Sequence, residues 1–217
     1  MTVVARLRGR LGALWPRGGD AQDRWVVVDT ETSGLDPKRD ALLAIGAVAV
    51  DAAGIRLDDS FEVVLRNASA GDAHNVAIHG IGYMAQSTGT PADVALPAFA
   101  AYVAGAPCCA FHASFDRTVL ARAFTANGTA PAPVRWLDVA ELAAALYPEQ
   151  HKRGERSLDD WLASHAIGAH ARHSAAGDAY VTAELLLRLR ETAAAQGSRG
   201  FAGLARLARQ HKWLGTS

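Results

Sequence analysis

Five residues with side chains suited to metal-assisted hydrolysis lie in three short segments that are far apart in the chain. In order, they are Asp29, Glu31, Asp116, His173 and Asp178. Hard divalent cations prefer carboxylate oxygens to cysteine sulfur or clustered imidazoles. Two such ions about 3.5–4 Å apart can activate water and bind a phosphate group, with coordination positions left open for both. Four carboxylates and one histidine therefore predict a two-metal site that cleaves phosphodiester bonds.

The first segment has the spacing of a strand. Asp29 and Glu31 follow residues 25–28, a β-branched and aromatic run typical of a buried strand. Residues two positions apart on a strand point to the same face, so these carboxylates can bind one ion together. Acidic pairs also occur at ordinary strand ends, where they are solvated. This pair therefore indicates a metal site only together with the other two segments.

The second and third segments are associated with helix starts. Asp116 follows an apolar strand at 107–111, and we expect Ser114 to cap the next helix and place Asp116 in its first turn. His173 and Asp178 are five residues apart, which on a regular helix separates side chains by about 140°. They converge only if His173 precedes the helix and Asp178 lies within it, so we expect a break just before Asp178.

Taken together, these motifs resemble the DEDDh-type 3′–5′ exonucleases, the family of ribonuclease T and of the epsilon proofreading subunit of bacterial DNA polymerase III. The resemblance covers about residues 23–192, and further matching features lie at 29–37, 40–48 and 78–81. It implies an α/β fold, a ribonuclease H-like mixed β-sheet flanked by helices. The order of expected strands and helices along the chain agrees with that fold.

The resemblance also implies roles for the site residues. Asp29, Glu31 and Asp178 would bind the ion that activates water, and Asp29 with Asp116 would bind the ion near the leaving group. His173 would be the general base. The cofactors would be two divalent metal ions, Mg²⁺ or Mn²⁺. The residues expected to bind the substrate are Thr30, Thr32, Leu35, His79, Gly80, His112 and Phe115.

Three of these substrate-binding positions have particular features. Leu35 would be an apolar wedge against the last bases, where contact is largely indifferent to base identity. Ordinary core packing is an equal alternative for Phe115. His112 stands where the family usually has Asn, so a hydrogen bond to the substrate could come from an imidazole instead.

A zinc site and a disulfide framework are both disfavoured by the cysteine content. His170 and His173 have a spacing that could suggest zinc, but structural zinc commonly needs four ligands with cysteine pairs. Only the adjacent Cys108 and Cys109 are present, on an expected buried strand. His170 is therefore expected to be a loop residue near the site. Without a disulfide framework or a visible secretory signal, we expect a cytoplasmic protein.

Charge is unevenly distributed along the 217 residues, although the formal net charge is zero. Lys and Arg outnumber Asp and Glu by five to two in residues 1–24 and by six to one in 188–217. In residues 25–187, nineteen acidic residues face eleven basic ones. The acidic middle contains the metal site, and the basic ends can attract phosphates or a partner. We expect weak, salt-dependent binding of nucleic acid.

The chain is expected to form an exonuclease domain at 23–192 between two extensions. The basic N-terminal extension, 1–22, has an amphipathic pattern that favours docking on the domain or a protein partner over a membrane surface. No apolar run of about 20 residues predicts stable membrane insertion. The C-terminal extension, 193–217, contains a short amphipathic helix. Its apolar stripe consists of Phe201, Leu204, Leu207 and Ala208.

Three functions remain in competition. The leading one is a metal-dependent exonuclease that releases nucleoside 5′-monophosphates from DNA 3′ ends, in proofreading or repair. The second trims RNA 3′ ends, and the third is a non-catalytic module that binds a polymerase. The expected partners are single-stranded or frayed 3′ ends of DNA, or of RNA in the second case, and a DNA polymerase or sliding clamp. A weak likeness of 210–214 to clamp-binding peptides suggests the clamp.

Overall fold

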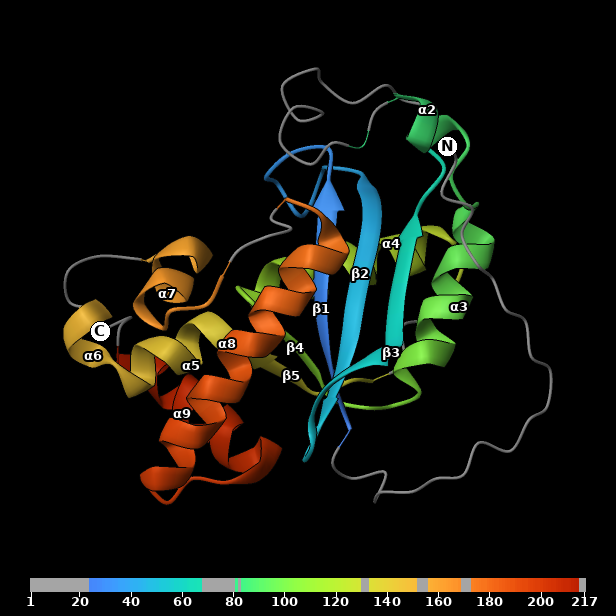
Figure 1. The fold of residues 1–217 in the computed structure, drawn as a ribbon. Coiled ribbons are helices and arrows are strands. Elements are labelled where there is room, and N and C mark those ends of the chain that lie inside the picture. The colour runs from blue at the N-terminus through green and yellow to red at the C-terminus, as the bar shows by residue number, and fades with distance from the viewer. Residues whose placement is uncertain are drawn as a thin grey trace.

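A mixed five-stranded sheet in the order β3-β2-β1-β4-β5 lies at the centre of the fold (Figure 1). The computed structural model describes residues 24–67, 81, 83–129, 133–151, 156–168 and 173–214. The strands are β1 (Trp25–Thr32), β2 (Leu42–Asp51), β3 (Gly54–Val64), β4 (Cys108–Ala110) and β5 (Trp136–Asp138). The first three pair antiparallel, whereas β4 is parallel to β1 and β5 to β4. The mixed sheet predicted from the sequence is confirmed.

Helices cover both faces of this sheet. Those in the described part of the chain are α2 (Tyr83–Ser87), α3 (Ala92–Val103), α4 (Ala113–Ala126), α5 (Val139–Leu146), α6 (Pro148–His151), α7 (Leu158–Ser164), α8 (Ala175–Ala195) and α9 (Gly200–Leu214). One core lies between the sheet and α3 and α4, and a second between the sheet and α5, α7, α8 and α9. Figure 1 shows α8 lying across one face of β1 and β2. None of the described helices is both long and apolar enough to span a membrane.

The central strand β1 is buried on both faces, which explains its continuous apolar run. Val27 packs in the core beneath α8, whereas Val26 and Val28 pack in the core beneath α3 and α4. Because side chains alternate along a strand, Asp29 has the orientation of Val27 and Thr30 that of Val28. The two faces of β1 thus present different side chains to α8 and α4.

A glycine allows α8 to approach the sheet closely. Gly46 on β2 pairs with Asp29 on β1, and a Cβ at Gly46 would overlap the backbone of Ala175 and Ala176. The first turn of α8 therefore rests on β2 beside Asp29 only because this position lacks a side chain. This contact sets where α8 begins relative to the end of β1.

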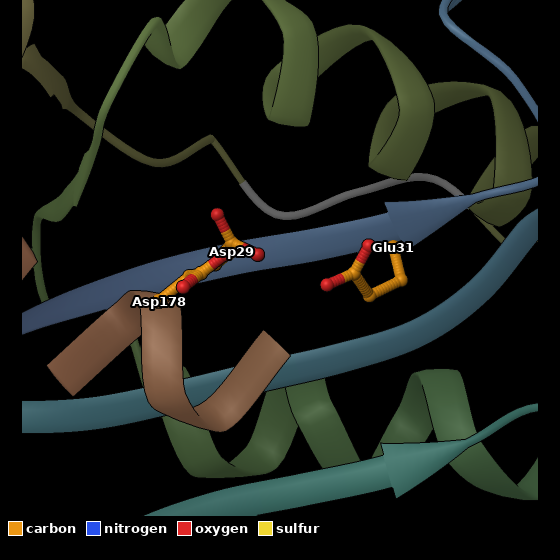
Figure 2. A group of neighbouring side chains, drawn as sticks. All are labelled: Asp29, Glu31 and Asp178. Atoms are coloured by element: carbon orange, nitrogen blue, oxygen red, sulfur yellow. The ribbon is translucent and has the colours of Figure 1, made fainter. Parts of the chain in front are cut away.

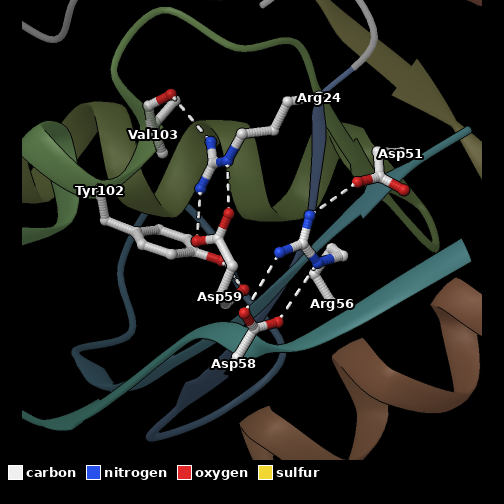
Figure 3. Close-up of polar contacts among 7 residues, drawn as sticks. All are labelled: Arg24, Asp51, Arg56, Asp58, Asp59, Tyr102 and Val103. Carbon is white, nitrogen blue, oxygen red and sulfur yellow. Dashed lines mark hydrogen bonds and ion pairs between the residues drawn. The ribbon is translucent and has the colours of Figure 1, made fainter. Parts of the chain in front are cut away.

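A polar network fixes the start of β1 to the rest of the domain (Figure 3). The Arg24 guanidinium donates two hydrogen bonds to Asp59 of β3, at 2.8 and 2.9 Å, and lies 4.9 Å from the Tyr102 ring centroid. The Tyr102 hydroxyl donates to the Asp59 carbonyl oxygen at 2.8 Å. On the same strand, Arg56 donates to Asp58 and to Asp51 at the end of β2. The network joins β1, β3 and α3.

The C-terminal helix α9 packs against α5 and β5. Three residues of the predicted apolar stripe, Phe201, Leu204 and Ala208, are buried, and Leu207 is partly buried against the same core. The Phe201 ring meets the Trp25 ring edge to face at 5.5 Å between centroids. The amphipathic pattern of α9 therefore serves packing on the domain itself.

Candidate functional site

Three carboxylates converge at the end of β1 (Figure 2). One oxygen each of Asp29, Glu31 and Asp178 lies within 4.8 Å of the other two. Asp29 and Glu31 are half-buried neighbours on one face of β1, as strand alternation requires, and Asp178 reaches them from the first turn of α8. Residues from distant parts of the sequence thus form one compact acidic group.

A left-handed turn before α8 brings His173 to this acidic group. His173 has φ 67°, and its backbone N–H donates to Asp178 Oδ1 at 3.3 Å. The next residue, Ser174, caps the helix by accepting from the Gly177 N–H at 3.2 Å. His173 thus precedes the helix and Asp178 lies within it, as expected, although the helix begins at Ala175 rather than just before Asp178.

Asp116 is buried and contacts β1 from α4. It lies in the first turn of α4, and its Oδ1 accepts a hydrogen bond from Thr30 Oγ1 at 2.8 Å. Burial raises the pKa of Asp116 to about 7, with a smaller contribution from the charge of Asp138, whereas the Thr30 hydrogen bond opposes the rise. Asp116 is not among the three carboxylates that lie within 4.8 Å of one another.

The start of α4 differs from the sequence expectation. His112, not Ser114, is the N-cap residue, and it has a left-handed conformation with φ 59°. Its carbonyl oxygen accepts from the Phe115 N–H at 2.9 Å, so Ser114 already lies inside the first turn. The His112 side chain is exposed, with its ring 4.6 Å from the Phe111 ring, whereas Phe115 is half-buried against the α3 and α4 core.

The remaining predicted substrate-binding residues lie in or beside the loop after β1. Leu35 is 92% exposed, which is unusual for a large apolar side chain. Thr32 is buried, and its hydroxyl donates to the Gly34 carbonyl at 2.5 Å. The Thr30 hydroxyl donates a hydrogen bond to Asp116. His79, Gly80 and His170 lie outside the described residues.

Supporting residues that sequence reasoning missed hold this loop. Asp40 Oδ2 accepts from the Asp36 N–H at 2.7 Å, and Ser33 Oγ accepts from the Ala41 N–H at 2.9 Å. A Cβ at Gly34 would collide with the Asp40 carboxylate, so the loop folds tightly over this residue. The alternation of Ser, Gly and Asp was a turn signal that could have identified the loop as ordered.

The acidic group is chemically suited to divalent metal ions. Its donors are all carboxylate oxygens, the ligands that Mg²⁺ and Mn²⁺ prefer. Three such groups within 4.8 Å repel one another when ionised, and a bound dication would remove that repulsion. The donor set contains no thiolate, since both cysteines are buried in β4.

Comparison with known proteins gives matches over most of the chain. Residues 26–186 match the family RNase_T, described as exonuclease. The chain is 31% identical over 189 residues to a DNA polymerase III subunit epsilon-like protein of Rhodobacter capsulatus, covering 86% of this chain and 26% of that protein. It is 28% identical over 177 residues to the PolC-type DNA polymerase III of Thermotoga maritima, covering 80% and 12%. The chain thus spans about a quarter or less of these relatives.

Solved structures share the fold. Exonuclease X in complex with 5′ overhanging duplex DNA superposes with a TM-score of 0.66 and 22% identity, covering 85% of this chain and 99% of that one. E. coli exonuclease I in complex with a dT13 oligonucleotide has a TM-score of 0.68 and 18% identity, covering 81% and 42%. These likenesses confirm the ribonuclease H-like fold predicted from the sequence.

Proposed function

The chain belongs to the RNase T exonuclease family, whose members are phosphodiester hydrolases, and from this premise we propose that it shortens DNA from the 3′ end. The observation that carries the proposal is the convergence of Asp29, Glu31 and Asp178 beside the turn at His173. Each cleavage would release one nucleoside 5′-monophosphate. The polymerase relatives and the two DNA-bound nuclease structures support DNA as the substrate.

The family depends on divalent metals, and this chain has a fitting donor set. Asp29, Glu31 and Asp178 would hold one Mg²⁺ or Mn²⁺, and Asp29 with Asp116 would hold the second. Such ions would activate water and offset charge on the scissile phosphate. The Thr30 hydroxyl donates to Asp116 Oδ1 and would help to orient this carboxylate.

His173 would serve as the general base. Its side chain is exposed, and its backbone N–H donates to Asp178 Oδ1, which ties the residue to the acidic group. Imidazole is well suited to accept a proton near neutral pH. In the proposed reaction His173 takes the proton of the attacking water, which reaches the phosphorus in line with the departing 3′-oxygen.

Exposed side chains around the site would select an open 3′ end. Leu35 projects into solvent after β1 and would pack against the terminal bases, as an apolar contact that ignores base identity. His112 is exposed at the start of α4 and would donate to the terminal nucleotide. A role in proofreading, with a DNA polymerase as partner, is supported by the names of the relatives, and a role in repair or a sliding clamp as partner is the alternative within the same proposal.

A single assay tests this function. The substrates are 5′-labelled single-stranded DNA, a duplex with a mismatched 3′ end, RNA of the same sequence, and circular single-stranded DNA. With Mg²⁺ or Mn²⁺, linear DNA should shorten stepwise and circles should persist, and EDTA should stop the reaction. Asp29→Ala serves as the inactive control. Cleavage of circles would indicate an endonuclease, and faster loss of RNA would favour the trimming of RNA 3′ ends.

A further inference from the structure

A cavity of about 220 Å³ lies beside the candidate site, where α9 packs against the edge strand β5. Its walls come from the first turn of α4, from β5, from the start of α5 and from α9. Ala113 and Ser114 of α4 line it and directly follow His112, and Asp116 lies in the same helical turn. The cavity therefore adjoins the start of α4, next to His112, which the proposed function assigns to the terminal nucleotide.

The acidic and basic side chains that line this cavity differ in their contacts within the protein. The Asp138 carboxylate caps α5 by accepting from the N–H groups of Ala140 and Glu141. The Glu141 carboxylate lies 3.0 Å from His211 Nδ1 on α9. Arg117 and Arg209 are exposed, and within the described residues neither forms an ion pair. The two acidic groups already have partners in the protein, so the cations are left for a ligand.

The outer face of α9 extends this positive surface. The sequence Gly200–Leu214 contains no acidic residue, and its buried face is apolar. Arg206 and Arg209 are both exposed and lie three positions apart, which places them on one side of the helix. Part of the basic excess at the C-terminal end of the sequence is thus displayed by a packed helix that lines the cavity.

We propose that Arg117 and Arg209 bind backbone phosphates of the substrate strand upstream of its 3′ end. This inference rests on the proposed function, because it takes the strand to be DNA held at Asp29, Glu31 and Asp178. A guanidinium matches a phosphate with two parallel hydrogen bonds, and such contacts position a strand without reading its sequence. A formally neutral chain with an acidic site would in this way attract a polyanion from one side.

The test compares two double variants of the whole chain. Arg117→Gln/Arg209→Gln removes the proposed contacts, and Arg188→Gln/Arg199→Gln removes the same charge from exposed arginines of α8 and the turn after it. Binding of a labelled DNA strand of about 20 nucleotides, longer than a typical single-strand site, is measured by fluorescence anisotropy with EDTA. Hydrolysis of the p-nitrophenyl ester of thymidine 5′-monophosphate, which has no upstream phosphate, reports on the catalytic site.

The expected result for Arg117→Gln/Arg209→Gln is weaker binding and a weaker dependence of Kd on salt. Each lost single-strand phosphate contact lowers the slope of log Kd against log salt by about 0.7, so two contacts lower it by about 1.4. The ratio of variant to wild-type Kd should then fall about sevenfold between about 50 and 200 mM salt. Ester hydrolysis should not change, and the control pair should behave as wild type.

Equal slopes and Kd values for the two double variants would overturn the inference. Arg209→Gln alone, an exposed substitution by another good helix former, keeps the test valid if the double variant is poorly folded. It should lower the slope of log Kd against log salt by about half as much as the double variant does. A wild-type protein that binds the strand but hydrolyses neither strand nor ester would refute the proposed function, while the Kd comparison would still decide this inference.

Discussion

Replacing Asp178 with Asn should stabilise the metal-free protein. Asp178, Asp29 and Glu31 lie within 4.8 Å of one another, and two unit charges at that distance repel by about 3.5 kcal/mol at an effective dielectric constant of about 20. The substitution removes two of the three repulsive pairs. Solvent and salt screen these half-exposed groups, so we expect a gain of about 1–3 kcal/mol. Asn keeps an oxygen that can accept from the His173 N–H.

Metal should reverse this order of stabilities. A ligand at 100 times its Kd stabilises the folded state by about 2.7 kcal/mol, and the wild type, with its complete carboxylate set, should gain more than the variant. Thermal unfolding with EDTA and then with Mg²⁺ or Mn²⁺ measures both effects, at about 2–4 °C for each kcal/mol. Glu62→Gln, which removes one exposed carboxylate from β3, is the matched control.

The coupling between these carboxylates can be refuted directly. If Asp178→Asn were less stable than wild type with EDTA, and Mg²⁺ or Mn²⁺ raised the Tm of both proteins equally, the three carboxylates would not form a shared metal site. A stabilisation by Glu62→Gln as large as that by Asp178→Asn would show an effect of net charge alone.

Three further predictions concern the general base, the packing of α8 and the buried carboxyl group. His173→Ala should lower the rate about 10²–10⁴-fold while metal still raises the Tm, and His170→Ala should stay within a few-fold of wild type; the opposite pattern would mean that the third motif is misaligned by three residues. Gly46→Ala should destabilise the protein by about 1–3 kcal/mol and reduce activity, because the methyl group overlaps the backbone of Ala175; unfolding and hydrolysis measured in parallel check this, and an unchanged Tm would contradict it. In the folded state the pKa of Asp116 is about 7, above its ordinary value near 3.8. Between these pH values the folded state binds more protons than the unfolded state. The free energy of unfolding with EDTA should therefore fall as pH rises from about 4 to 7. Asp116→Asn should remove that part of the fall in urea unfolding series, and an unchanged pH profile would show that Asp116 is ionised throughout.

The convergence of Asp29 and Glu31 could be predicted from the sequence, because the two-residue period of a strand fixes which side chains share a face. The placement of His173 before a helix and Asp178 within it followed from the helical period in the same way. The exact helix start could not be predicted so well. It depends on the Ser174 cap and on the left-handed turn at His173, although a serine before an alanine-rich helix was an available signal.

Other features depend on contacts between distant elements, which local patterns do not specify. The first-turn position of Asp116 was predictable, but its hydrogen bond to Thr30 arises only when α4 packs against β1. The apolar stripe of α9 predicted a buried face without indicating that α5 and β5 would cover it. The cavity between α4 and α9 follows from that docking, so Arg117 and Arg209 could not be grouped from the sequence.

His112 and His173 adopt a left-handed backbone beside the candidate site, as Ala104 and Ala166 do elsewhere in the described residues. A non-glycine residue in this conformation costs about 1–2 kcal/mol, and His112 and His173 both adopt it within the described residues. Asn, the residue that the resemblance led us to expect at position 112, is among the few side chains that adopt such a backbone readily, as histidine is. The shape of the main chain thus limits which side chains can be exchanged there. Selection of variants for thermal resistance alone should accumulate Gly at both positions, and at position 173 this would remove the imidazole.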